Sequence, residues 1–482
     1  MLLEERTGLA DVRIDFKFKG ISEIKTVIMS VTGYDDAATI INSVRVNELI
    51  ATKTQSIVGN VPKQVLTIDM ISNDKELIPT NKESKYYGLM DSSCVIYVYV
   101  RAVGDDTDWS ECAFGKFFVT SWRPKSSTED NKSVSIEAVC RMGALMKSSI
   151  PNIKLFKGYD LQWYIHVACN KINQSSENDD LKFSTEIQLD KYNTTSDLML
   201  KASNMGELLN LISLSNIKFI FFDRQYSLKS KSYLGSEDNI EPIVKLTDST
   251  SVVNGVLDTG TNLYGKLNVN YVGTQVSEEK QLATVTGHKL GLSTDTNAYT
   301  TVSFPALPNN VYKITGVQLR YLNEDVSDVE VRDISYNGNS VTLRLLNWSS
   351  SVTEVDITIM GQEILEYDLL DTYTIDSSNE ASLDITNRLG EMQTIDEYGD
   401  EMCELLRNTK SLEITGNFNI KIQPGDIIEV ELETLETHCL ALVIGCNWEF
   451  DGAVNCKMSL LVIKELSVDK NENTEGGSQV GI

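Results

Sequence analysis

The chain has 482 residues, 41% of them hydrophobic, which is enough apolar material for the cores of about three globular domains. Its 43 basic and 69 acidic residues give a formal net charge of -26. That charge argues against specific nucleic-acid binding, which needs cations to displace phosphate counterions, and against docking on an anionic membrane surface.

Neither a leader nor a membrane helix is expected. Glu4 and Glu5 interrupt the apolar start of the chain, so it does not read as a signal peptide. The longest apolar runs, such as residues 439–444, are far shorter than the roughly 20 residues of a membrane helix. We therefore expect a protein made in a cytoplasm, with its eight cysteines reduced. Cys446 and Cys456 flank an expected hairpin turn, and there too we expect thiols.

Residues 1–146 are expected to form a first all-β domain. Apolar and polar side chains alternate over residues 11–18, 64–70 and 133–139, which is typical of strands with one buried face. Residues 95–100 (VIYVYV) are all β-branched or aromatic and indicate a central strand, and residues 117–122 predict a further one. A short helical stretch at 140–146 ends the domain.

The pattern then changes, and residues 147–235 predict a small α/β insert. Residues 159–173 carry apolar side chains at helical spacing. A second helix is expected at 204–214, because Asn204 followed by Glu207 is typical of a capping box. An apolar strand at 218–222, a turn at 223–225 and a returning strand complete the insert.

The rest of the chain is again rich in alternating strands. We expect a β-rich domain at 236–370, with strands at 266–272, 311–321, 340–346 and 354–360. Residues 371–466 predict a helix at 394–407, followed by strands at 411–414, 418–422, 427–432, 440–446 and 457–463. Residues 467–482 are polar and glycine-rich, which indicates a disordered tail. No internal repeat is evident in the sequence, although both β regions are built alike.

The candidate metal-binding and catalytic motifs of the sequence do not have the spacing or the number of copies that their chemistry needs. His166, His288 and His438 are never paired at i, i+4, so no zinc motif is formed. The segment Asp258-Thr259-Gly260 matches the loop of an aspartic protease, but one copy suits a turn between strands better.

Residues 260–266 (GTNLYGK) approach a phosphate loop, yet leucine follows where a metal-binding hydroxyl is needed. Paired carboxylates at 105–106 and 179–180 lie in polar stretches and suit a solvated surface. A glycoside hydrolase could still place its two carboxylates anywhere in so acidic a chain. The sequence therefore predicts no catalytic, cofactor-binding or metal-binding residue, and no enzyme.

The order of elements points to a family. A β domain ending in SIEAVCRMGALM precedes an insert containing NMGELLNLISLSNIKFIFFDRQYSL, and a later β region opens with LYGKLNVNYVG. The chain then runs through a helix into SLEITGNFNIKIQPGDIIEV. This order resembles the baseplate hub proteins of contractile phage tails and of related tail-like particles. Its most specific piece is the turn Pro424-Gly425-Asp426, where Pro424 presets φ, Gly425 takes a positive φ and Asp426 bonds back. Residues 274–350 fit less well and look like a β insertion.

The resemblance implies a mainly β fold with an α/β insert, comprising two tail-tube-like β-barrel domains and smaller α+β domains. Three copies would form a homotrimeric ring that joins the tail tube to a central spike and lines the channel for DNA or a tape-measure protein. The implied partners are the tube or tube-initiator protein, the spike, baseplate wedge proteins and the tape measure, assembled in a virion tail or tail-like particle. The acidic charge would keep DNA from sticking to the channel, or would serve solubility alone.

Two alternatives remain. One is a tail-tip or receptor-binding β protein that recognises a cell-surface glycan. Exposed aromatic clusters at a loop-rich end would favour it, whereas the dispersion of the five tryptophans indicates core roles. The other is a hub-associated cell-wall hydrolase, for which the chain offers no Cys/His or zinc motif.

Overall fold

The computed structural model describes most of the chain in a series of ranges. They are 8–30, 38–48, 61–125, 133–146, 148, 153–155, 161–174, 182–189, 198–200, 204–233, 241–248, 251–258, 264–294, 298–304, 307–308, 311–321, 324–337, 340–350, 353–389, 394–407 and 410–466. The expected tail at 467–482 and residues 259–263 of the two motif-like segments lie outside them.

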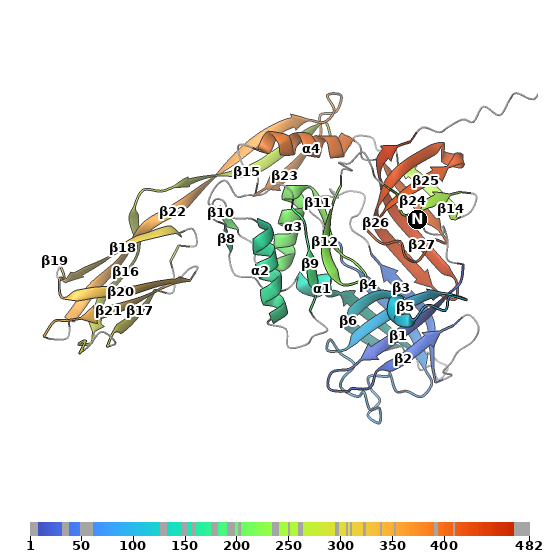
Figure 1. The fold of residues 1–482 in the computed structure, drawn as a ribbon, viewed down its shortest axis with the longest axis horizontal. Coiled ribbons are helices and arrows are strands. Elements are labelled where there is room, and N and C mark those ends of the chain that lie inside the picture. Colours follow the sequence, from blue (N-terminus) through green and yellow to red (C-terminus); the bar gives the residue numbers. More distant parts are fainter. Residues whose placement is uncertain are drawn as a thin grey trace, which may run out of the picture.

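The N-terminal β unit consists of antiparallel strands in the order β3-β4-β7-β6-β5-β1-β2 (Figure 1). Their bounds are β1 Ala10–Lys17, β2 Lys25–Met29, β3 Thr39–Asn47, β4 Val65–Ser72, β5 Val95–Ala102, β6 Ala113–Lys125 and β7 Ser133–Cys140, with a 3-10 turn at Trp109–Glu111. The alternation predicted the inner face correctly, since Val12, Ile14 and Phe16 are completely buried. All five strands expected here are confirmed, and β5 is central.

The α/β insert packs its helices against short strands. It contains α1 (Arg141–Leu145), β8 (Ile153–Leu155), α2 (Leu161–Gln174), β9 (Ser184–Glu186), β10 (Leu198–Leu200), α3 (Met205–Asn216), β11 (Lys218–Phe222) and β12 (Ser227–Ser232). The capping box is confirmed: the Asn204 side-chain oxygen accepts from the Glu207 backbone N–H at 2.9 Å, and its amide donates to the Glu207 carboxylate at 3.0 Å.

A long neck carries a separate outer domain away from the rest of the molecule (Figure 1). The strand expected at 354–360 is in fact β22 (Thr353–Thr374), which pairs with β15 (Lys266–Val276) along the neck. β23 (Ser382–Asn387) and α4 (Ile395–Arg407) lie at its base. The outer domain comprises residues 277–363, with β16 Lys280–Leu290, β17 Thr300–Phe304, β18 Val311–Tyr321, β19 Glu324–Asp325, β20 Val329–Asn337, β21 Ser340–Asn347 and the start of β22. It has a hydrophobic cluster of its own, around Leu343, Leu345 and Ile357.

The C-terminal β unit is built from β13 (Lys245–Thr247), β14 (Val252–Asp258), β24 (Ser411–Gly416), β25 (Ile427–Leu432), β26 (Thr437–Phe450) and β27 (Val454–Glu465), with a 3-10 turn at Glu433–Leu435. Four of these strands lie in the order β14-β24-β27-β26, and β25 joins β26 to β13. The strand predicted at 418–422 is wrong. The Arg224 guanidinium donates to the carbonyl oxygens of Ile420 and Ile422, and Ile422 N–H turns back to Asn419 at 3.1 Å, so no strand ladder forms.

The predicted Pro-Gly-Asp turn is confirmed. Gly425 has a φ of +92°, and the Asp426 carboxylate accepts from the Gln423 backbone N–H at 2.9 Å. The prediction of core roles for all tryptophans fails for three of them, and one of these is Trp109, which belongs to none of the hydrophobic clusters. Trp448 is completely buried, but Trp163 on α2 is 52% exposed and Trp348, after β21, is 46% exposed.

Candidate functional site at the sheet junction

The two β units share one sheet through strands β3 and β26, which lie about 400 residues apart in sequence. β3 pairs with the last four residues of β26, from Asn47 opposite Asn447 to Val44 opposite Phe450. The Arg45 guanidinium and the Glu449 carboxylate form a cross-strand ion pair at 2.7 Å. Thirteen strands of the described part of the chain thereby become one sheet with one main hydrophobic cluster. The joined sheet makes the two units a single structural piece.

A buried ion pair lies behind this junction. The Glu48 carboxylate is completely buried and accepts hydrogen bonds from the Gln64 amide at 2.8 Å and the Trp448 indole N–H at 3.3 Å. The Arg224 guanidinium, from the turn between β11 and β12, lies 3.6 Å from the same carboxylate. Burial raises the pKa of Glu48, against the opposing effects of Arg224 and Trp448.

The N-terminal β unit, the α/β insert and the C-terminal β unit together form the body of the molecule, and Arg224 contacts all three. Its guanidinium lies 3.9 Å from the ring centre of Phe114, on β6 of the N-terminal unit. It also donates to the main-chain carbonyls of Ile420 and Ile422 in the C-terminal unit, while its own backbone belongs to the α/β insert. Because Arg presents several donors in one rigid plane, a single side chain can satisfy partners on three elements. Arg224 thus sets how the insert sits on the joined sheet.

The two β units repeat one strand pattern. The order β3-β4-β7-β6-β5 in the first corresponds to β14-β24-β27-β26-β25 in the second, and every neighbouring pair in both runs is antiparallel. Even the irregularities recur: the β6–β7 register shifts between Val119 and Ser121, and the β26–β27 register shifts between Val443 and Gly445. The two β regions, which are built alike in sequence, therefore form a structural repeat.

Those candidate chemical residues that lie in the described ranges do not converge on a site. His438 lies 2.9 Å from Glu429 and near Glu431, but the Lys245 ammonium already bonds both carboxylates, at 2.9 and 2.7 Å. A cation of the protein thus fills the place that a metal ion would take. His166 lies on α2 and His288 on β16, in separate parts of the chain. Asp258 ends strand β14, as the turn interpretation requires.

The cysteines are free thiols, and all but Cys112 are buried. Burial raises the pKa of Cys94 to about 12 and of Cys439 to about 11, so these thiols are inert hydrophobic groups, as predicted. In the described part of the chain no helix has the length and apolar character needed to cross a membrane.

The fold and the junction define a mainly β protein in which two repeated β units share one sheet. No family model matches the sequence. No curated protein matches it either.

Solved structures do resemble the fold along most of the chain. The 43 kDa tail protein of prophage MuSo2 from Shewanella oneidensis matches 94% of this chain and 98% of its own, at 10% identity and a TM-score of 0.47. A tail protein from Neisseria meningitidis MC58 matches 93% and 96%, at 8% identity and 0.47. The E. coli c3393 protein, described as a type VI secretion component structurally similar to T4 tail proteins gp27 and gp5, matches 93% and 76%, at 9% identity and 0.40. Two of these similar structures are tail proteins and the third is a component of a type VI secretion system.

Proposed function

We propose that this chain is a structural subunit of a phage-type tail or tail-like particle, and that copies of it join edge to edge into a hub ring. The observation that carries the proposal is the repeated strand pattern with its one internal junction. Within the chain, β26 of the second unit pairs with β3 of the first. By the repeat, β6 corresponds to β26 and β14 corresponds to β3. The same junction can therefore form between β6 of one copy and β14 of the next.

Both strands have the edge that this junction needs. In the described structure β14 pairs with β24 alone, and its Val253 side chain is 83% exposed. On β6, pairing with β5 stops at Phe118, so residues beyond it pair with β7 on one side only. An unpaired strand edge is a template for another chain, and a closed ring would cover it.

The register follows from the internal junction. Asn447 lies two residues beyond the shift at Gly445 and faces Asn47. The equivalent residues are Arg123, two beyond the shift at Ser121, and Asp258, because Asp258 pairs with the first residue of β24 as Asn47 pairs with the first of β4. The repeat thus places an arginine opposite an aspartate. Pro124, which follows Arg123, cannot donate a backbone hydrogen bond to the neighbouring strand. The contact between Arg123 and Asp258 is therefore the part of the junction to test.

Three copies would place six β units around a channel, as the resemblance implies, with the tail tube on one side and the spike on the other. In this arrangement the chain acts by holding its neighbours and lining the channel for DNA or a tape-measure protein, without catalysis. The net charge of -26 suits a channel through which a polyanion passes without sticking.

Charge reversal tests the ring. Arg123→Asp and Asp258→Arg each place like charges opposite one another, and each is expected to weaken self-association by about tenfold or more. The double variant restores the opposite charges and should recover the assembly. Light scattering after size-exclusion chromatography, at micromolar protein, gives the mass of each species. Arg332→Asp changes an exposed arginine of the outer domain and is the matched control. A monomeric wild type, or assemblies indifferent to both reversals, would contradict the proposal.

A further inference from the structure

We propose that the outer domain binds neutral pyranose units of a cell-surface polysaccharide. The site is an apolar platform formed by Leu292 and two aromatic residues, Tyr299 and Trp348, which are 47%, 41% and 46% exposed. These residues lie outside the hydrophobic cluster of the domain, so its folding does not require them at the surface. Exposed aromatic side chains gathered at one loop-rich end are typical of recognition surfaces.

Ser293 brings the platform residues together. Its backbone N–H donates to the Asn347 carbonyl at 2.9 Å, and its hydroxyl accepts from the Asn347 N–H at 2.9 Å. The same hydroxyl donates to the carbonyl of Ala298 at 2.6 Å. Leu292 precedes Ser293 in the sequence, Trp348 follows Asn347 and Tyr299 follows Ala298. One serine therefore ties the three chain segments that carry the platform.

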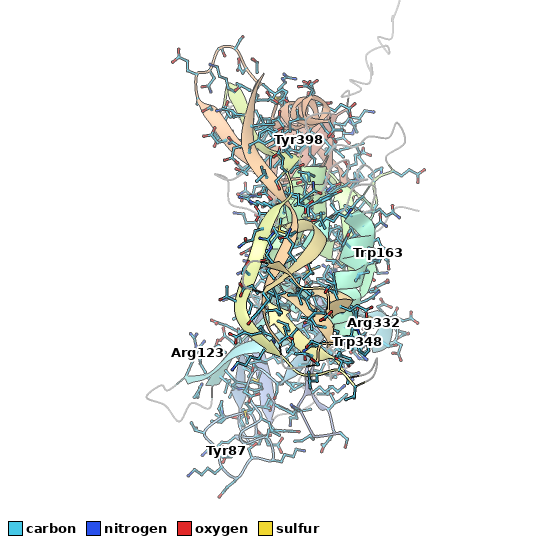
Figure 2. The ribbon with its side chains drawn as sticks, turned by 90° about the vertical axis from the view of Figure 1, so that its left-hand side faces the viewer. Tyr87, Arg123, Trp163, Arg332, Trp348 and Tyr398 are labelled. Carbon is cyan, nitrogen blue, oxygen red and sulfur yellow. The ribbon has the colours of Figure 1, made fainter. Side chains whose placement is uncertain are left out.

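The aromatic rings are held by polar neighbours. The Trp348 indole N–H donates to the Glu330 carboxylate at 3.3 Å, and Arg332 lies 3.7 Å from Glu330 on the same surface (Figure 2). The Arg344 guanidinium lies 4.8 Å from the ring centre of Tyr299. Rings fixed in this way lose little conformational entropy when a ligand stacks on them.

The chemistry of the surface favours a neutral sugar. A pyranose ring has an apolar C–H face, which stacks on an indole or phenol ring, and a rim of hydroxyls, which bond to carboxylates and guanidinium groups. Both charge types are present and already paired, Arg332 with Glu330 and Arg344 with Asp333 at 3.7 Å. Each of these two ion pairs is balanced in charge, so neither of them favours an anionic or a cationic ligand.

The position of the domain supports this role. The outer domain lies at the end of the neck, away from the sheet that carries the proposed ring junction (Figure 1). A module placed there can reach a surface outside the ring without disturbing it. The inference does not rest on the proposed ring, because the Arg123→Asp variant, which should break the ring, leaves Trp348 unchanged.

The test uses the full chain and four neutral probes: chitohexaose, cellohexaose, maltohexaose and mannohexaose. Saturation-transfer NMR and calorimetric titration at millimolar sugar are expected to detect binding of at least one. Trp348→Ala should weaken that binding by about tenfold or more, whereas Trp348→Phe keeps a stacking face and should retain most of it. Trp163→Ala removes an equally exposed tryptophan on α2 and is the matched control.

The inference is overturned if none of the four sugars binds the wild type, or if Trp348→Ala binds as the wild type does. It is also overturned if Trp348→Ala leaves sugar binding intact and changes only the mass of the assembly, because the platform would then be a contact between copies. Melting temperatures of all variants show whether each remains folded.

Discussion

At the scale of single residues, Glu48 and Arg224 show how a buried charge can be retained at a junction of three elements. Burying a carboxylate costs free energy, and a nearby guanidinium and hydrogen bonds offset only part of that cost. The pKa of Glu48 is raised because the effect of burial, which favours the neutral acid, is larger than the opposing effects of Arg224 and Trp448, which favour the carboxylate. Asp426, on the turn beside Lys231, has its pKa raised for the same reason. The junction therefore favours protonation of both acids.

This imbalance predicts a pH dependence. Because the folded chain holds the Glu48 proton more tightly than the unfolded chain does, the stabilisation is complete below the ordinary carboxyl pKa of 4.5 and is lost as the pH rises through the raised value. Between about pH 7 and about pH 5, the wild type should gain melting temperature relative to Glu48→Gln, which cannot titrate. Calorimetry across this range measures the difference. Glu449→Gln, which changes an exposed carboxylate of the same junction, is the control, and a difference independent of pH would refute the prediction.

At the scale of elements, helix α4 is seated on the neck through a glycine. A Cβ added to Gly399 would lie 2.3 Å from the Tyr373 ring of β22. The Tyr373 hydroxyl donates to the Ile395 carbonyl and the Asp396 carboxylate, each at 3.1 Å, so the ring bridges the neck and the start of α4. Burial and the Asp396 charge raise the pKa of Tyr373.

The close packing of α4 on Tyr373 predicts that a Gly→Ala substitution in this helix lowers stability, whereas in a free helix it raises stability. In a free helix Gly→Ala stabilises by about 1 kcal/mol. Gly399→Ala should instead destabilise by about 1–3 kcal/mol, because the methyl group displaces the Tyr373 ring from both hydrogen bonds. Adding Tyr373→Leu removes the clash and should allow the alanine to recover part of that loss. Melting temperatures of Gly399→Ala, of Tyr373→Leu alone and of the double variant decide the matter, and a Gly399→Ala protein that melts above the wild type would refute the close packing.

Most elements could be predicted from sequence, because an element buried on one face carries apolar residues at the spacing of a strand or a helix. Strands β1 and β4 and the capped helix α3 are examples. The strand expected at residues 418–422 is absent although Phe418 and Ile422 are buried with the spacing of a strand, because the carbonyls of Ile420 and Ile422 bond to Arg224, about 200 residues away. The length of β22 was missed because its neck half carries exposed Leu365, Tyr367 and Leu370 on no regular face. Glu48 and Arg224 gave no signal, since only pairing of β3 with β26 brings them together.

At the scale of the whole molecule, the outer domain is inserted into the chain as a separately packed unit. The chain enters and leaves it at adjacent points, because Val276 of β15 pairs with Ile364 of β22. Its hydrophobic cluster is separate from the two clusters of the body. Both proposed edges of the ring, on β6 and β14, lie in the body. Fold and assembly should therefore be separable from sugar binding.

Excision of the outer domain tests this separation. Replacing residues 277–363 by Asn-Gly would join the last pair of the neck through a two-residue turn that suits an antiparallel hairpin. We expect the shortened chain to form assemblies of the same number of copies as the wild type and to bind none of the four hexasaccharides. Light scattering gives the copy number, and the NMR titration gives the binding. A shortened protein that is folded but monomeric would place a ring contact in the outer domain, and one that still binds sugar would move the site into the body.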